Sequence, residues 1–166
     1  MTDFRCSIRP PLTAGGIAGT AVSRRGFTVI ELMAVVAVIG LLSAIGVPKF
    51  REFRKKALIA KAIGEIHALQ TDLSTADTLP DDLGGIGRSG MQDPWGNPYV
   101  YNKFPPNRQV PPGARRDRFL VPINSTFDLY SMGEDGRSNP PLQGGPSRDD
   151  IVRGNDGGFI GLAINF

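Results

Sequence analysis

The segment from Phe27 to Val47 constrains this chain more than any other part, because it is a long apolar run with one ionisable side chain, Glu31. A helix of these 21 residues would rise about 31 Å, enough to cross the hydrocarbon core of a bilayer. The sequence therefore predicts a membrane span. A carboxylate in such a span costs about 2 kcal/mol or more unless a cation neutralises it, and the run itself supplies none.

The residues on either side of this carboxylate form a specific pattern. Residues 24–32 read Arg-Arg-Gly-Phe-Thr-Val-Ile-Glu-Leu, and the apolar run ends at Pro48. This order and spacing resemble the N-terminus of type IV prepilins and type II secretion pseudopilins. The resemblance implies that a prepilin peptidase cuts after Gly26 and methylates the new amine of Phe27. That amine would neutralise Glu31 of a neighbouring subunit, so that a costly charge sets the register of a filament.

Two other interpretations of the apolar run remain. Glu31 could reach the lipid headgroups from an ordinary membrane anchor. A secretory signal peptide would instead need small residues at −3 and −1, but a cut after Ala44 places Leu42 at −3. Both flanks of the run are basic, so counting Lys and Arg does not orient the helix. A cytoplasmic leader, with the C-terminal domain in the periplasm, follows from the resemblance.

The predicted organisation has four parts: a leader (1–26), a transmembrane assembly helix (27–47), its amphipathic continuation (48–77) and a C-terminal domain (78–166). The leader holds four Arg and one Asp of the 19 basic and 16 acidic residues, which leaves 15 of each in the mature chain. Nucleic-acid binding is therefore not indicated. Cys6, the only cysteine, also lies in the leader, so the mature chain has no internal disulfide.

The helical pattern resumes after Pro48, which should bend the helix without ending it. A bend here would let packed helices slide past one another, so Pro48 is predicted to assist assembly. Breaker residues then predict an end between Leu73 and Thr78. Apolar residues at spacings of three and four predict a stripe, most of which covers the domain's own sheet. The stripe consists of Phe50, Phe53, Ala57, Ala60, Ile63, Ile66, Leu69 and Leu73.

The C-terminal half predicts short strands joined by long loops. Residues 93–101 read Asp-Pro-Trp-Gly-Asn-Pro-Tyr-Val-Tyr, a turn that leads into a strand and places Trp95 against the helix. This segment is similar to a motif of the major pseudopilins of type II secretion. Further strands are expected at 118–123, 127–132 and 158–164. The expected fold class is α+β, with a long N-terminal helix packed on a small antiparallel sheet, as in pilins.

Two acidic segments suggest a calcium site. Residues 131–138 (Ser-Met-Gly-Glu-Asp-Gly-Arg-Ser) and 149–151 (Asp-Asp-Ile) resemble the calcium loop of the major pseudopilins. Carboxylates and loop carbonyls are oxygen ligands that suit this ion. The resemblance implies Asp135 and Asp150 as ligands, then Asp149, with the carbonyl of Met132. No organic cofactor is expected.

An alternative without metal also fits these acidic residues. Residues 134–136 would form a turn, and Asp149 and Asp150 would cap a short helix from 151 to 154. The segment 138–143 is longer and stiffer than the glycine-rich stretch usual in the family's loop.

The sequence predicts a structural subunit and not an enzyme. The mature chain has no cysteine, a single isolated histidine (His67) and no nucleophile motif. The resemblance implies a secretion pseudopilus subunit that forms a homo-oligomeric filament. Its partners would be minor pseudopilins, the prepilin peptidase, and an inner-membrane assembly platform with its ATPase. A type IV pilin, major or minor, and a monotopic anchored binding domain are the alternatives.

Overall fold

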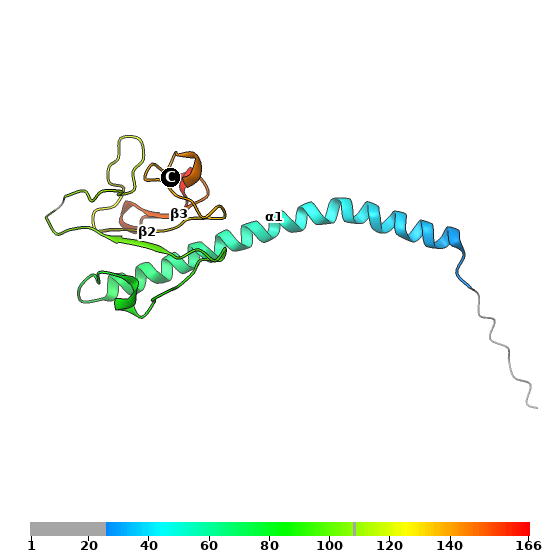
Figure 1. The fold of residues 1–166 in the computed structure, drawn as a ribbon, viewed down its shortest axis with the longest axis horizontal. Helices are drawn as coiled ribbons and strands as arrows, with labels where there is room; N and C mark the ends of the chain where they lie inside the picture. The colour runs from blue at the N-terminus through cyan, green and yellow to red at the C-terminus, as the bar shows by residue number, and fades with distance from the viewer. Residues whose placement is uncertain (1–25, 108) are drawn as a thin grey trace, which may run out of the picture. The chain divides into compact units, whose positions relative to one another are not determined.

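The computed structural model describes residues 26–107 and 109–166 and has an α+β fold (Figure 1). One long helix, α1 (Val29–Thr75), precedes four strands and several short 3-10 helices. The chain divides into two compact units, Met1–Ser43 and Ala44–Phe166. The expected cleavage leader, apart from Gly26, lies outside the described residues.

The described part of the first unit is a short non-helical stretch, residues 26–28, followed by the beginning of α1. All the large apolar side chains from Val29 to Leu42 are exposed, to between 47% and 77%. α1 contains a stretch that is long and apolar enough to cross a membrane, and none of that stretch is buried. The apolar run therefore forms the continuous helix that its composition predicts.

The second unit contains an antiparallel sheet in the order β1-β2-β3-β4. Its strands are β1 (Val100–Lys103), β2 (Phe127–Ser131), β3 (Ile151–Gly154) and β4 (Phe159–Leu162). Tyr101 pairs with Leu129, and Val152 pairs with both Tyr130 and Gly161. Sequential antiparallel strands of this length match the small sheet that the sequence predicts.

The central strands β2 and β3 are buried on both faces. Their side chains alternate between a side covered by the helix and a side covered by loops. On the helix side, Phe127, Leu129 and Ile151 pack against one face of α1, formed by Ala62, Ile66, Leu69 and Leu73. On the loop side, a second cluster combines Val152 with residues of the long connections: Ile123, Leu142 and Ala163. The C-terminal part of α1 and the loops therefore enclose the sheet between them (Figure 1).

The predicted apolar stripe on the helix is correct only in its C-terminal half. Phe50 and Phe53 are each 70% exposed, and Ala57 and Ala60 are also exposed. A strand of five residues spans about 17 Å, whereas the predicted stripe runs along about 35 Å of helix. The sheet is therefore too short to cover the whole stripe. α1 does continue through Pro48 and ends at Thr75, as predicted.

Two predictions for the loops and strands are wrong. Residues 118–123 form no strand, because Asp117 and Leu120 exchange backbone hydrogen bonds in a tight turn and Arg118 has a φ of 41°. Residues 151–154 form β3 and not the short helix of the alternative interpretation. The turn expected at 134–136 is present within residues 133–136, and the strand expected at 127–132 is β2. The strand expected at 158–164 is shorter, as β4.

Candidate functional site

The first turn of α1 brings together the residues predicted to direct assembly. Gly26 and Phe27 lie in the non-helical stretch before the helix, and the Phe27 side chain is 81% exposed. Exposed chain without regular structure is the kind of backbone that proteases bind most readily. The predicted cleavage position is therefore accessible in the described part of the first unit.

Thr28 and Glu31 bond to each other across this turn. The Thr28 backbone N–H donates to Glu31 Oε2 at 2.8 Å, and its hydroxyl donates to the same oxygen at 2.9 Å. In return the Glu31 N–H donates to Thr28 Oγ1 at 3.3 Å. This reciprocal arrangement is a capping box, which satisfies amide groups that the first turn of a helix otherwise leaves unpaired.

The capping box gives Glu31 a role inside its own subunit that the sequence analysis missed. The signal was present, because Thr28-Val29-Ile30-Glu31 has the spacing of this motif. The carboxylate also lies at the positive end of the helix dipole, which favours a negative charge. The cationic partner from a neighbouring subunit stays a prediction, as do the processing roles of Gly26 and Phe27.

Pro48, predicted to assist assembly, lies in the second unit within α1. The large side chains on either side of it, Val47 and Phe50, are 50% and 70% exposed. The first three turns of α1 in the second unit therefore present apolar surface that the sheet does not cover.

The Asp-Pro-Trp-Gly segment forms a clamp between the turn before β1 and the end of β2. Asp93 Oδ1 accepts hydrogen bonds from the backbone N–H groups of Trp95 and Asn97 at 3.0 and 2.9 Å. Its Oδ2 accepts one from the hydroxyl of Ser131 at 2.5 Å. Asn97 continues the clamp by donating to the carbonyl of Gly133 at 2.9 Å. Trp95 packs against the core cluster on the helix side, as predicted.

The carboxylates predicted to bind calcium lie in two separate segments, at 135 and at 149–150, and each accepts hydrogen bonds from different donors. Asp149 Oδ2 accepts hydrogen bonds from the N–H groups of Glu134 and Asp135 at 2.9 and 3.2 Å. Asp135 is exposed, and its Oδ1 accepts from the Arg137 N–H at 2.8 Å. Met132 is half-buried beside them, between β2 and the turn.

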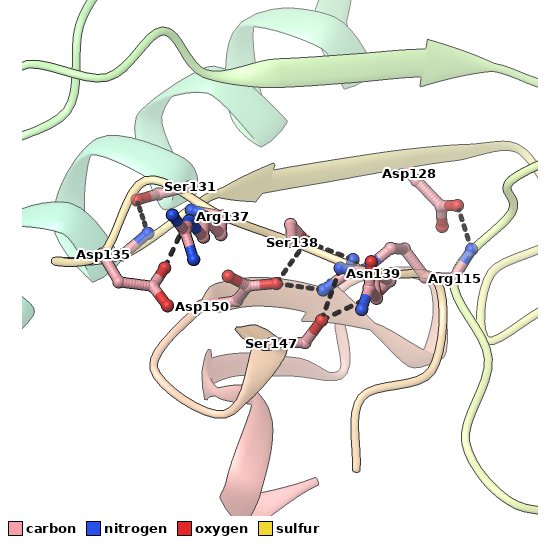
Figure 2. A network of polar contacts seen from close by, with 10 residues as sticks. Arg115, Asp128, Ser131, Asp135, Arg137, Ser138, Asn139, Ser147 and Asp150 are labelled. Carbon is pink, nitrogen blue, oxygen red and sulfur yellow. Dashed lines mark hydrogen bonds and ion pairs between the residues drawn. The ribbon is translucent and has the colours of Figure 1, made fainter. Parts of the chain in front are cut away.

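Asp150, the other predicted main ligand, is completely buried against an arginine (Figure 2). Its Oδ2 contacts the Nη2 of Arg115 and accepts a hydrogen bond from the Ser138 hydroxyl at 2.5 Å. Burial raises the pKa of the Asp150 carboxyl, against the lowering effects of Ser138 and of the Arg115 charge. Burial therefore favours the neutral form of Asp150, whereas the Arg115 charge and the Ser138 hydrogen bond favour the ionised form.

This arrangement does not fit a calcium ion at Asp150. Calcium needs six to eight oxygen ligands. The Asp150 carboxylate could offer only one, its buried Oδ1, which has no hydrogen-bond partner among the described residues. Within residues 26–107 and 109–166, no three His, Cys, Asp or Glu side chains group as metal ligands. The calcium site thus stays a prediction from resemblance, and Arg115 is the residue that the prediction overlooked.

The chain resembles known proteins along most of its length. Residues 22–47 match the family described as the prokaryotic N-terminal methylation motif. Type II secretion system core protein G of Pseudomonas aeruginosa is 32% identical over 133 residues, covering 75% of this chain and 89% of that protein. The Escherichia coli protein of the same name is 30% identical over 138 residues, covering 68% and 83%.

A second group of relatives matches only the N-terminal part. A fimbrial protein of Pseudomonas aeruginosa is 41% identical over 54 residues, which are 32% of this chain and 35% of that protein. The match thus spans about a third of the fimbrial proteins. No solved structure matches the chain. The long match to core protein G and the methylation motif show that the chain belongs to the type IV pilin superfamily, as a pseudopilin of the type II secretion core protein G family.

Proposed function

We propose that this chain is the structural subunit of a type II secretion pseudopilus, processed at Gly26 and polymerised through α1 to support protein export. The observation that carries the proposal is the combination of an exposed apolar helix and a single carboxylate in its first turn. Relatives named core protein G align over most of both chains, which supports a secretion role. Its family is one of structural subunits and not of enzymes.

The proposed processing changes the charge next to Glu31. Cleavage after Gly26 would turn the Phe27 nitrogen into a protonated, methylated amine, four residues before Glu31. Thr28 already donates two hydrogen bonds to that carboxylate, but neither donor carries a charge. The amine of an adjacent subunit would supply the missing positive charge as the helices stack.

Charge pairing has a special weight in this setting, because apolar contact does not distinguish lipid from a neighbouring helix. Lipid tails are as apolar as leucine, so helix association in a bilayer depends on packing and polar contacts. Removing one partner from a buried ion pair costs about 3–5 kcal/mol. One such pair per subunit is enough to favour a single stacking register over its alternatives.

The remaining parts of the proposal follow from this assembly route. The subunit would wait in the bacterial inner membrane as a single-pass protein, with its C-terminal domain in the periplasm. The prepilin peptidase would process it, and the inner-membrane assembly platform and its ATPase would add it to a filament that includes minor pseudopilins. α1 is the candidate membrane helix for this state.

Substitution of Glu31 tests the assembly step. Glu31→Ala is compared with Glu52→Ala in cells that contain the secretion machinery, and filament recovery is measured after shearing. Glu52 is a matched control, because it is an exposed carboxylate of α1 that forms salt bridges with the nearby Lys49 and Lys56. We expect Glu31→Ala to stay in the membrane fraction and Glu52→Ala to assemble. Normal filaments from Glu31→Ala would contradict the proposed pairing.

A type IV pilus subunit is the second candidate, favoured by the 41% identity to fimbrial proteins. That identity is confined to 54 residues, whereas the match to core protein G extends over 133. Loss of protein secretion, and not of motility or adhesion, in a deletion strain would support the secretion role.

A further inference from the structure

Arg115 is the most deeply enclosed cation in the described part of the chain. It lies in the long connection between β1 and β2, and only 2% of its surface is exposed. Its backbone N–H donates to Asp128 Oδ2 at 2.7 Å, which ties the connection to β2. Lys and Arg are almost never fully buried unless they are paired, so this position calls for a specific partner.

The guanidinium of Arg115 is surrounded by oxygen atoms of the connection between β2 and β3 (Figure 2). Nη1 donates to the Ser138 hydroxyl at 2.5 Å and to the Asn139 carbonyl at 2.6 Å. Nη2 contacts the carboxylate of Asp150. The group also lies over the ring of Tyr130, 4.2 Å from its centre. One cation thus joins residues 138, 139 and 150 to β2.

The oxygen atoms around the guanidinium are of the same kinds that a hard divalent cation would take: a hydroxyl, a carbonyl and a carboxylate. Here the positive charge comes from the chain itself. A metal ion beside Asp150 would lie close to the guanidinium, and like charges in a buried site repel each other strongly. Arginine also keeps its charge at any physiological pH and donates in a fixed fork.

Asp149, the neighbour of Asp150 in this connection, already has hydrogen-bond partners without a cation. Asp149 Oδ2 accepts two backbone N–H groups from the turn at 133–136, so this carboxylate closes the turn by hydrogen bonds. The two segments also pack closely at Gly133, where an added Cβ would lie 2.5 Å from the Asp149 carbonyl oxygen. The connection therefore has internal links at both Asp149 and Asp150.

From these contacts we propose that Arg115 is a built-in cation that holds the connection between β2 and β3, so that the second unit keeps its structure without calcium. The proposal does not depend on whether the chain assembles into a filament, because every contact lies within the second unit. It departs from the calcium site that the family resemblance implies.

Calcium dependence of thermal unfolding tests the first half of the proposal. The full chain is purified in detergent, treated with a chelator and unfolded with or without saturating calcium chloride, with Trp95 fluorescence as the readout. We expect the same midpoint in both conditions. An ion bound at about 100 times its dissociation constant would instead raise the midpoint by roughly 10–20 °C, and such a shift would overturn the proposal.

Paired substitutions test the second half. Arg115→Met removes the charge but keeps an apolar stem, and it should lower the midpoint by about 10 °C or more, because Asp150 loses its counter-charge. Arg115→Met with Asp150→Asn should recover at least half of that loss. Arg116→Met is the matched control, because Arg116 is next to Arg115 in the chain but exposed. We expect it to change the midpoint little.

The substitutions also separate charge from packing. If the double variant is no more stable than Arg115→Met, the arginine acts by filling space and the proposal is wrong. If Arg115→Met alone does not fold, the comparison of the double variant with the parent still decides the matter. A double variant that folds, with an unfolding midpoint within a few degrees of the parent's, supports charge compensation. A double variant that fails to fold contradicts it.

Discussion

Removal of the Asp93 carboxylate should be among the most damaging single changes in the second unit. Asp93 is 5% exposed and accepts three hydrogen bonds, two from its own turn and one from Ser131 at the end of β2. It is therefore the side chain that links the Asp-Pro-Trp-Gly turn to the sheet. Asp93→Ala leaves these donors without their acceptor.

The three bonds differ in what they contribute. Ser131 is completely buried, so its hydroxyl finds no water when the carboxylate is removed. An unsatisfied buried donor costs about 1–3 kcal/mol, and hydrogen bonds to charged acceptors contribute about 1.5–3 kcal/mol. The N–H groups of Trp95 and Asn97 are nearer the surface, so water can replace part of the hydrogen bonding that they lose. We therefore expect Asp93→Ala to lower the free energy of unfolding by about 3 kcal/mol.

A double-mutant cycle with Ser131→Ala isolates the bond that crosses to the sheet. The double variant should be less destabilised than the sum of the single variants, by about 1–2 kcal/mol, because each single change already breaks the same bond. Unfolding in urea, followed by Trp95 fluorescence of the full chain in detergent, measures each value.

The matched control is Asp77→Ala, which changes an exposed carboxylate and should stay within about 0.5 kcal/mol of the parent. An Asp93→Ala variant within about 1 kcal/mol of the parent would refute the clamp. Strictly additive effects of Asp93→Ala and Ser131→Ala would show that the bond between them contributes nothing.

Three further changes have defined outcomes. Gly133→Ala should destabilise the second unit in urea unfolding, since Gly133 has a φ of 66° and an added Cβ would lie 2.5 Å from the Asp149 carbonyl. Thr28→Ala should cost about 1 kcal/mol of local helix stability and speed amide exchange in the first turn of α1. Although burial raises the pKa of Asp156, hydrogen bonds from Ser125 and the charge of Arg153 hold it below its ordinary value overall. Asp156→Asn should therefore destabilise at neutral pH, and the difference should vanish as the pH falls through the folded pKa.

Each of these changes has an outcome that would contradict its reasoning. If Gly133→Ala has the same stability in urea as the parent, the turn moves freely away from the Asp149 carbonyl. If Thr28→Ala leaves amide exchange in the first turn of α1 unchanged, the capping box does not stabilise the start of the helix. A carboxyl whose pKa is lowered on folding stabilises above its unfolded pKa and ceases to do so in acid, so a growing difference in acid would refute the sign for Asp156.

The N-terminal half of the fold was readable from the sequence because its signals are local. An apolar run of membrane length and a breaker cluster after Leu73 need no knowledge of the tertiary structure. The capping box is an equally local signal, because Thr28 and Glu31 have its spacing, but an isolated carboxylate in an apolar run indicates first a need for a cation. Phe50 was misassigned because periodicity shows which residues share a face and not how far the sheet extends along it.

The C-terminal half is less predictable because its two central strands, β2 and β3, are buried on both sides. β3 lacks the alternation of polar and apolar residues that marks a half-exposed strand, so Ile151–Gly154 fitted a helix equally well. Arg115 lies in a basic, proline-rich segment typical of a solvated loop. Only the fold shows that Asp150, 35 residues away, is its partner.

The mass of the protein extracted from membranes of cells that contain the prepilin peptidase tests the central claim most directly. If the chain is a pseudopilin subunit of the proposed kind, the mass should equal that of residues 27–166 plus one methyl group. Fragmentation should place that methyl group on the amine of Phe27. A protein that retains its first 26 residues, or begins after Ala44, would contradict the account.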